Sequence, residues 1–382
     1  MPETLRDTYP YWLKRTFRFF NYRDERKRFF REIGIKKEQD QLIRKYNRET
    51  ENLVIFLVPG ADRKTGKDTI SGGVTSLVSL CEESAKLSKM MNAEVLMTVF
   101  PREFLLLKHE NFENNVDVFR FEQLPTYFTK LKSVLIHIPE FLVAHFEENL
   151  LESELKWLVS IPKVHVNVIN ANILLMPSEH VVKQLESVAT KITITAAHTK
   201  YCTQYYRDIY GVPIHKFSAW ISPEQYVFVP YEKKEDIIVI SPDQNENKAI
   251  ILSRLGETKL ELKILENLTY KDFKELVGRA KWALTFGEGL DGYILEPIFS
   301  GTVAFAVYNE DFFTPDFEHT NGIYGSYNEM LENIVSDIRK LDNPESYKAF
   351  QKEQFDLCAK HYNYETYQRN IRLFYEEKYS FK

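Results

Sequence analysis

The chain has 382 residues, of which 44% are hydrophobic and 27% are charged, and its formal net charge is -5 at pH 7. A chain of this length exceeds the size that one hydrophobic core sustains, so we expect two domains. The net charge excludes a general attraction to nucleic acid, and the three widely spaced cysteines exclude a disulfide framework or a zinc motif. With no long apolar run, these features predict a cytoplasmic protein of enzyme size.

Residues 1–50 are predicted to form a helical extension in which basic and aromatic side chains alternate. Most of them fall in residues 11–31. Such a stretch can lie on an anionic membrane surface, which would place the protein at the inner face of the membrane. Alternatively, the aromatic side chains pack on the body of the protein and the basic ones are solvated. The basic residues of this stretch include Lys14, Arg15, Arg18, Arg23, Arg26, Lys27, Arg28 and Arg31, and the aromatic ones include Trp12, Phe17, Phe19, Phe20, Phe29 and Phe30.

Short apolar runs alternate with helical patterns from Leu53 to Trp220. The run Leu53–Val58 predicts a strand that is covered on both faces, and Gly72-Gly73 then opens a helix that continues to about Met91. This alternation is typical of a doubly wound parallel sheet. Further strands are predicted over 94–100, 116–121, 133–138, 163–169 and from 191, and helices over 142–157, from 178 and up to 211.

His137 and Glu140 lie at the carboxyl edge of the strand predicted over 133–138. Open α/β sheets bind their ligands at this edge, so His137 is a candidate catalytic residue as well as a candidate structural one. His198 follows the next-but-one strand in a similar position. A linker is predicted near Ser222–Glu235, because this segment combines two prolines with a run of charges.

The second half of the chain repeats the alternation of strands and helices. Its centre is the strand Ala283–Phe286, a glycine-bearing turn, the helix Tyr293–Ser300 and the strand Val303–Val307, with Gly301 ending the helix. A glycine turn before a helix N-terminus presents N–H groups that suit phosphate. Two carboxylates flank this turn, and because carboxylates do not bind phosphate they indicate sugar hydroxyls beside it. The other predicted elements are strands over 236–240 and 260–265 and helices over 248–255, 270–280, 327–341, 345–360 and 364–379.

The segment EGLDGYILEPIFSGTVAFAVYN resembles the E-x7-E segment of the retaining GT-B glycosyltransferases of family 4. Glu288 and Glu296 match the two family glutamates, and Gly301-Thr302 matches the Gly-Thr that follows. The resemblance implies that Glu288 and the loop after it bind the donor sugar, whereas Glu296 binds the nucleotide ribose. Asp291 and the next glycine replace the family's Gly-Leu. An ordinary βαβ turn with two solvated glutamates is the alternative interpretation.

The same resemblance assigns roles elsewhere in the chain. Gly72 and Gly73 would face the donor diphosphate, and Lys248 matches the family lysine that holds it, but Asp243 stands where the family has an arginine. The catalytic candidates are thus Glu288, Lys248 and His137. The candidates for substrate binding are Gly72, Gly73, Glu288, Gly289, Leu290, Asp291, Gly292, Glu296, Thr302 and His198, and no metal ligand is predicted.

The fold implied by the resemblance is α/β with GT-B architecture, in which two Rossmann-like doubly wound domains face a central cleft. We expect a helical N-terminal extension over 1–50, an acceptor-side domain over 51–228 and a donor-side domain over 229–362. The last segment, 363–382, would be a helix that crosses back onto the first domain.

The function implied by the resemblance is transfer of a sugar from a nucleoside-diphosphate sugar to a glycan, a lipid-linked or a protein-linked acceptor. The resemblance implies retention of configuration, no metal ion and no cofactor, as in bacterial surface polysaccharide or glycoconjugate synthesis. Nucleic acid is not an expected partner. Two alternatives stay open: a non-catalytic GT-B-like subunit of a glycosyltransferase complex, which Asp243 favours, and a GT-B enzyme of other chemistry such as a sugar-nucleotide epimerase or a phosphorylase.

Overall fold

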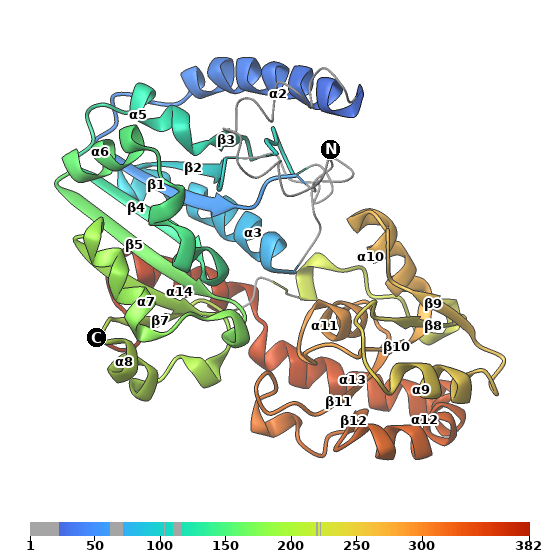
Figure 1. Ribbon diagram of the computed structural model, residues 1–382. Coiled ribbons are helices and arrows are strands. Elements are labelled where there is room, and N and C mark those ends of the chain that lie inside the picture. Colours follow the sequence, from blue (N-terminus) through green and yellow to red (C-terminus); the bar gives the residue numbers. More distant parts are fainter. Residues whose placement is uncertain (1–22, 62–71, 103, 110–115, 219–220, 222) are drawn as a thin grey trace, which may run out of the picture.

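Two parallel β-sheets, each covered by helices, make up the computed structural model (Figure 1). The described residues are 23–61, 72–102, 104–109, 116–218, 221 and 223–382. The strands of the first sheet lie within residues 52–216 and those of the second within 235–324. The α/β class predicted from the sequence is therefore confirmed. The domain limits at residues 228 and 362 remain a proposal, which the positions of the two sheets support.

The first sheet has seven parallel strands in the order β3-β2-β1-β4-β5-β6-β7. Its central strands are almost fully buried, because helices cover both faces, and this explains their continuous apolar runs. In the register of the sheet, His137 of the fourth strand is the partner of Asn167 on the fifth. The strands are β1 (Asn52–Val58), β2 (Glu94–Val99), β3 (Val118–Arg120), β4 (Ser133–Pro139), β5 (Lys163–Asn170), β6 (Lys191–Ala196) and β7 (Ile214–Lys216).

The helical pattern predicted over 142–157 was wrong in its extent. The chain forms two short 3-10 helices, Glu140–His145 and Glu147–Asn149, before the α-helix α6 (Glu152–Ser160) begins. The break occurs because Leu151 has extended backbone angles and its N–H donates to the Glu154 carboxylate at 2.6 Å, which caps the new helix. The other helices of this domain are α3 (Gly72–Lys86), α4 (Ser88–Met91), α5 (Leu124–Tyr127), α7 (Glu179–Gln184) and α8 (Gln204–Tyr210).

The second sheet has five parallel strands in the order β12-β11-β10-β8-β9. Its edge strand β12 lies between the strand predicted over 303–307 and the helix predicted over 327–341, where no element is predicted from the sequence. The strands are β8 (Glu235–Ile240), β9 (Glu261–Ile264), β10 (Ala280–Leu284), β11 (Val303–Val307) and β12 (Ile323–Tyr324), and the helices are α9 (Lys248–Leu255), α10 (Tyr270–Arg279), α11 (Gly292–Phe299), α12 (Tyr327–Leu341) and α13 (Pro344–His361).

Gly301 ends α11 as predicted. Its φ is +84°, the left-handed conformation that favours glycine, and a Cβ at this position would lie 2.5 Å from the Val229 carbonyl oxygen. The sharp turn lets β11 begin at Val303, directly after the helix. This βαβ unit carries both glutamates of the E-x7-E segment.

The helix α14 (Tyr364–Tyr375) leaves the second domain and packs on the first, where it lies against α3 (Figure 1). Ile371 and Phe374 are buried in the same core cluster as residues of β1 and α3. Beyond the helix, Phe381 forms an antiparallel bridge with Ile214 at the edge strand β7. These contacts support the crossing-back implied by the resemblance, and the helix ends four residues earlier than predicted.

The helix α2 (Arg23–Leu42) runs along the outer side of the first domain (Figure 1). Its second half packs on the domain: Gln39 is fully buried and donates to the carbonyl oxygens of Leu106 and Val118 at 3.0 and 2.8 Å. Asp40 forms an ion pair with Arg120. The basic residues before 23 lie outside the described residues. Within the described ranges, no helix is long and apolar enough to cross a membrane.

Candidate functional site

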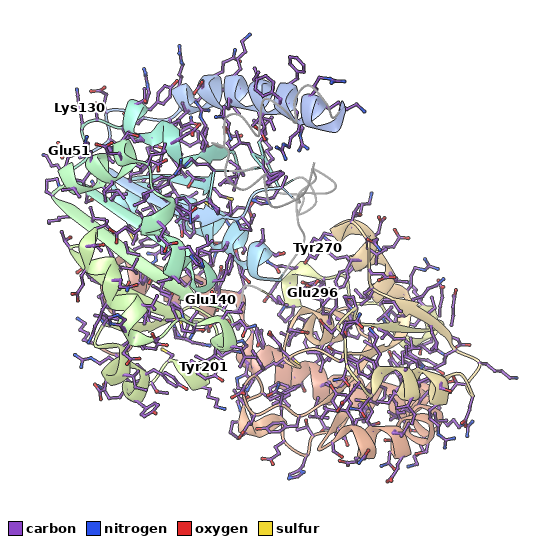
Figure 2. All side chains as sticks on the ribbon, in the orientation of Figure 1. Glu51, Lys130, Glu140, Tyr201, Tyr270 and Glu296 are labelled. Atoms are coloured by element: carbon purple, nitrogen blue, oxygen red, sulfur yellow. The ribbon has the colours of Figure 1, made fainter. Side chains whose placement is uncertain are left out.

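The carboxyl ends of the two sheets meet at one hydrogen bond between the domains. Asn172 follows β5 of the first sheet, and its side-chain amide donates to the carboxylate of Glu288, which follows β10 of the second sheet. Glu140 lies directly after the neighbouring strand β4 and accepts the Asn172 backbone N–H at 3.0 Å. Glu140 and Glu296 are both labelled near the junction of the domains in Figure 2. Parallel sheets bind ligands at these strand ends, so this junction is the candidate site.

A second set of contacts joins the domains beside the first. Tyr201 donates to the backbone carbonyl of Asp311 at 2.7 Å, and Lys200 forms an ion pair with the Asp311 carboxylate at 3.4 Å. The ring of His198, which follows β6, lies edge-on against Phe312 at 5.8 Å. Burial lowers the His198 pKa to about 4, so this imidazole is neutral at pH 7.

The glycine turn after β10 is tightly packed. Gly289 has a φ of +107°, and a Cβ at this position would lie 2.1 Å from the Phe313 ring, so only glycine fits. Leu290 is buried, whereas Glu288 and Gly292 are partly exposed. Burial raises the Glu288 pKa, the Asn172 amide lowers it, and Asp243 raises it further.

The first turn of α11 is capped by the protein's own carboxylate. Asp291 accepts the Tyr293 backbone N–H at 2.8 Å. Asp243 lies beside it, because a Cβ on Gly287 would be 2.6 Å from the Asp243 Oδ2 and 3.2 Å from the Asp291 Oδ2. Asp243 therefore points into the turn. Burial and the Asp243 charge raise the Asp291 pKa to about 8. The N–H groups expected to meet phosphate thus face two acidic side chains.

Glu296 lies on α11 within a small cluster of hydroxyl groups. It is 7% exposed and accepts the Tyr270 hydroxyl at 3.1 Å, and the Tyr226 hydroxyl lies 3.1 Å from that of Tyr270. Burial raises the Glu296 pKa to about 7, while the hydroxyls of Tyr226 and Tyr270 oppose this shift. Tyr270 begins α10, and its label lies beside that of Glu296 in Figure 2.

Lys248 and Thr302 are held by groups of the second domain. The Lys248 ammonium donates to the backbone carbonyls of Ser241 and Asp243 at 2.7 and 2.8 Å, and burial lowers its pKa. Thr302 is fully buried, and its hydroxyl accepts a hydrogen bond from Lys234 at 2.9 Å. Neither side chain forms a hydrogen bond with Glu288.

His137 lies inside the first domain. It is fully buried, stacks on Phe56 with a centroid distance of 4.3 Å, and lies within hydrogen-bond distance of Asn167 and Tyr375 at 3.0 and 3.2 Å. Burial holds its pKa well below the usual range. These partners satisfy both ring nitrogens, so the geometry favours a structural role.

Gly72 and Gly73 form the exposed start of α3. A Cβ at either position would meet no atom within 4 Å among the described residues. Their backbone N–H groups lie at the positive end of a helix dipole, which suits an anion. Nothing in the packing of the described residues requires glycine at these two positions.

The structure adds Glu140, Asn172 and Lys216 to the candidate site. The Lys216 ammonium donates to the Ala197 carbonyl at the end of β6, and burial lowers its pKa to about 8. These residues could have been identified from the sequence because each lies at or just after the end of a strand. Glu140 was noted at such a position, but its partner Asn172 is distant in sequence and only the fold brings the two together.

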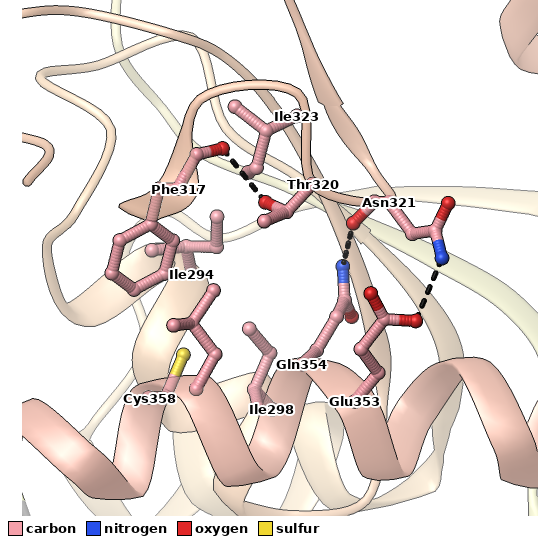
Figure 3. A pocket seen from close by; sticks show the side chains of 10 residues that line it. Ile294, Ile298, Phe317, Thr320, Asn321, Ile323, Glu353, Gln354 and Cys358 are labelled. Carbon is pink, nitrogen blue, oxygen red and sulfur yellow. Dashed lines mark hydrogen bonds between the residues drawn. The ribbon is translucent and has the colours of Figure 1, made fainter. Parts of the chain in front are cut away.

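A hollow in the second domain is lined by residues of α11, of α13 and of the segment 317–323 (Figure 3). Hydrogen bonds from Thr320 to Phe317 and from Gln354 to Asn321 close its polar rim at 2.7 and 3.1 Å. The remaining lining is mostly apolar, and its one carboxylate, Glu353, accepts the Asn321 side-chain amide at 2.7 Å. It is lined by Ile294, Ile298, Phe317, Thr320, Asn321, Ile323, Glu353, Gln354, Leu357 and Cys358.

No protein-family model and no curated protein sequence matches this chain. Among solved structures, it is similar to HepE from Anabaena in complex with UDP-glucose, with a TM-score of 0.52 and 10% identity over 85% of this chain and 99% of HepE. It is also similar to the trehalose-6-phosphate synthase OtsA, with a TM-score of 0.50 and 8% identity over 85% of this chain and 99% of OtsA. These identities are low, and the likeness concerns the fold: the chain has the two-domain GT-B fold.

Proposed function

We propose that the protein is a glycosyltransferase that moves a sugar from a nucleoside-diphosphate sugar to an acceptor hydroxyl. The observation that carries this proposal is the bond between Asn172 and Glu288, because it joins the carboxyl ends of the two sheets at the first glutamate of the E-x7-E segment. A donor held by the second domain and an acceptor held by the first would meet at this point. The GT-B fold supports this type of reaction.

We assign the donor to the unit formed by β10, α11 and β11. Glu288 and the turn Gly289–Gly292 would bind the sugar, and Glu296 the ribose. Thr302 would hold the start of β11, where its hydroxyl is hydrogen-bonded to the carbonyls of Val277 and Ala280. The tyrosine hydroxyls on Glu296 support the ribose assignment, since they show that this carboxylate accepts hydrogen bonds from hydroxyl groups. A ribose diol would take the place of one of them.

We assign the diphosphate to Lys248 and to the N–H groups of Gly72 and Gly73. Lys248 would turn away from the Ser241 and Asp243 carbonyls when a diphosphate is bound. The resemblance implies that such groups, rather than a metal ion, stabilise the leaving diphosphate. One preorganised donor of this type contributes about 3 to 4 kcal/mol to the transition state.

We assign the acceptor to the first domain, near His198. The acceptor class stays as the resemblance implies it: a glycan, a lipid-linked or a protein-linked saccharide, with transfer by retention in the synthesis of surface polysaccharide or glycoconjugate. A cytoplasmic protein that meets anionic lipid through residues 11–31 would suit a lipid-linked acceptor. His137 has no part in this proposal, because its ring is enclosed in the core.

A second candidate function is a non-catalytic GT-B subunit that supports a partner glycosyltransferase. The acidic pair Asp243 and Asp291 favours it, because two carboxylic groups beside the expected diphosphate would repel it when ionised. An epimerase acting on the same sugar nucleotides is the remaining alternative. We rank the epimerase after the transferase and the non-catalytic subunit, since no observation of the described residues favours epimerisation over transfer.

The test is calorimetric titration with UDP, GDP, CDP and dTDP, followed by incubation with the matching sugar nucleotides. The proposal predicts that at least one nucleotide binds and that its sugar nucleotide is slowly converted to free nucleoside diphosphate, with water as the acceptor. Binding without release of nucleotide, with water or with added saccharides, would support the non-catalytic subunit. Absence of binding by every nucleotide overturns the proposal.

A further inference from the structure

The carboxyl group of Glu140 is buried and only half satisfied. Glu140 is 4% exposed, and its Oε1 accepts the Asn172 N–H at 3.0 Å. Its Oε2 is also buried and has no hydrogen-bond partner among the described residues. A buried polar atom without a partner is costly, so such an atom at the ligand-binding edge of a sheet marks a place for a ligand group.

The groups around this oxygen define the chemistry of that ligand group. Burial raises the Glu140 pKa to about 7, although the backbone N–H groups of Glu140, Ala171 and Asn172 lower it, and the charge of Glu288 in the second domain adds to the rise. Both carboxyl groups accept hydrogen bonds when ionised. A phosphate oxygen, which also accepts, would be repelled here. A neutral ligand group that donates hydrogen bonds, such as a sugar hydroxyl, fits instead.

Asn172 connects the two carboxyl groups across the domain junction. Its backbone N–H binds Glu140 and its side-chain amide binds Glu288. The Asn172 side-chain oxygen accepts the Leu174 N–H at 2.9 Å, which fixes the turn after β5. The amide nitrogen is therefore held in the one orientation that faces the second domain.

We propose that Glu140 and Asn172 form the first domain's half of a sugar subsite opposite Glu288, in which the Glu140 Oε2 accepts a hydrogen bond from a hydroxyl of the transferred sugar. On sugar binding, the bond between Asn172 and Glu288 opens, and each of these side chains binds a hydroxyl. This inference rests on the proposed function. It adds a contact from the first domain to a sugar that the resemblance assigns to the second domain alone.

The test compares Glu140→Gln with the wild-type protein at pH 8, where the wild-type carboxyl group is ionised. Glutamine has the same shape, but its amide nitrogen donates where Oε2 accepts. Calorimetry gives the dissociation constants of UDP, UDP-glucose, UDP-galactose, UDP-N-acetylglucosamine, GDP and GDP-mannose. The sugar increment is the ratio of the dissociation constant of the nucleoside diphosphate to that of its sugar nucleotide.

In the wild-type protein, at least one sugar nucleotide should bind more tightly than its nucleoside diphosphate. Glu140→Gln should lower that increment about 10-fold or more, as expected for a lost hydrogen bond to a charged group, and leave the affinity for the nucleoside diphosphate within about 2-fold. Glu148→Gln is the matched control, since Glu148 is an exposed carboxylate of the same segment, and it should change neither quantity.

An unchanged sugar increment in Glu140→Gln overturns the subsite. Equal weakening of the nucleoside diphosphate and its sugar nucleotide also overturns it, because that pattern indicates a structural role. If the wild-type protein binds a nucleoside diphosphate but no sugar adds affinity, the subsite fails and the proposed function stands. If it binds no nucleotide at all, both fail. Should Glu140→Gln not fold, Asn172→Ser carries the same test, since a serine hydroxyl can still accept the Leu174 N–H.

Discussion

The Asp243 carboxylate lies so close to Gly287 that a Cβ at this position would be 2.6 Å from its Oδ2. The Asp291 carboxylate approaches the same point, at 3.2 Å. Burial and the neighbouring Asp243 raise the Asp291 pKa to about 8, so this pair holds a proton at neutral pH. The acidic pair occupies the strand-to-helix turn at which the donor is proposed to bind.

Stability should therefore fall as the pH rises toward 8. The pKa of Asp291 is raised from an ordinary value of 3.8 to about 8 in the folded state, so its contribution is complete below about pH 4 and is lost as the pH rises through 8. Asp291→Asn keeps a side-chain oxygen that can cap Tyr293 but removes this titration. Melting temperatures at pH 5.5 and 8.5 should differ less in the variant than in the wild-type protein. Equal differences would show that Asp291 does not bind the proton.

Gly289→Ala should destabilise the second domain and weaken nucleotide binding. The new Cβ would lie 2.1 Å from the Phe313 ring, and the φ of +107° adds backbone strain of about 1 to 3 kcal/mol. Gly72→Ala is the control, because a Cβ there meets no described atom within 4 Å and the backbone N–H remains. Thermal unfolding with and without the nucleotide measures both effects. A loss of stability in the control alone would contradict the packing argument.

Glu296→Ala should weaken the binding of a nucleoside diphosphate by about 1.5 to 3 kcal/mol, the range for hydrogen bonds to a charged group. The reason is that Glu296 is proposed to accept both ribose hydroxyls. Glu332→Ala removes an exposed carboxylate from the same domain and should leave the affinity unchanged. Calorimetric titration measures the affinity of both variants for the nucleoside diphosphate. Wild-type affinity in Glu296→Ala would rule out the ribose role.

Lys248→Ala should reduce kcat more than it weakens donor binding. Negative charge grows on the leaving diphosphate in the transition state, so the ammonium contributes more there than in the ground state. A loss of about 100- to 1,000-fold in kcat is expected for one preorganised donor. Lys259→Ala, at an exposed position after the same helix, is the control. Weaker binding with an unchanged kcat would instead make Lys248 an anchor of the donor.

Two truncations separate the interpretations of the basic N-terminal stretch. Deletion of residues 1–50 should lower the melting temperature, because it removes the buried side chains of Ile35, Gln39 and Ile43 from the first domain. Deletion of residues 1–22 should leave these contacts in place. If the stretch meets membrane, the shorter deletion should weaken sedimentation with anionic liposomes at 0.1 M salt, where the Debye length is about 10 Å. No liposome binding by the full chain at low salt would exclude membrane contact.

Most strands of the two sheets could be predicted, because they are apolar runs that end at glycine, proline or polar residues. The strand β12 could not, since its two residues Ile323 and Tyr324 are too few to show a period. The break before α6 depends on the Glu154 carboxylate capping Leu151, a local bond that the apolar spacing of the segment conceals. Its prediction as one continuous helix followed from that spacing alone.

The candidate site could be predicted where one segment carries it. Glu288 and Glu296 stand in a single strand-turn-helix unit, so their motif is readable in the sequence. The orientation of the Asp243 side chain toward the glycine turn could not be predicted from the sequence, because it depends on how β8 and β10 pair. Asn172 meets Glu288 only through the approach of the two domains, and no local pattern encodes that contact.

The packing of α14 affects the order in which the domains can be completed during synthesis. Ile371 and Phe374 belong to the core of the first domain, and Phe381 pairs with its edge strand at Ile214. These residues leave the ribosome after the whole second domain has been made. Domains usually fold in the order of their synthesis. Here the domain that is synthesised first receives the last part of its core only after the domain that follows it has emerged.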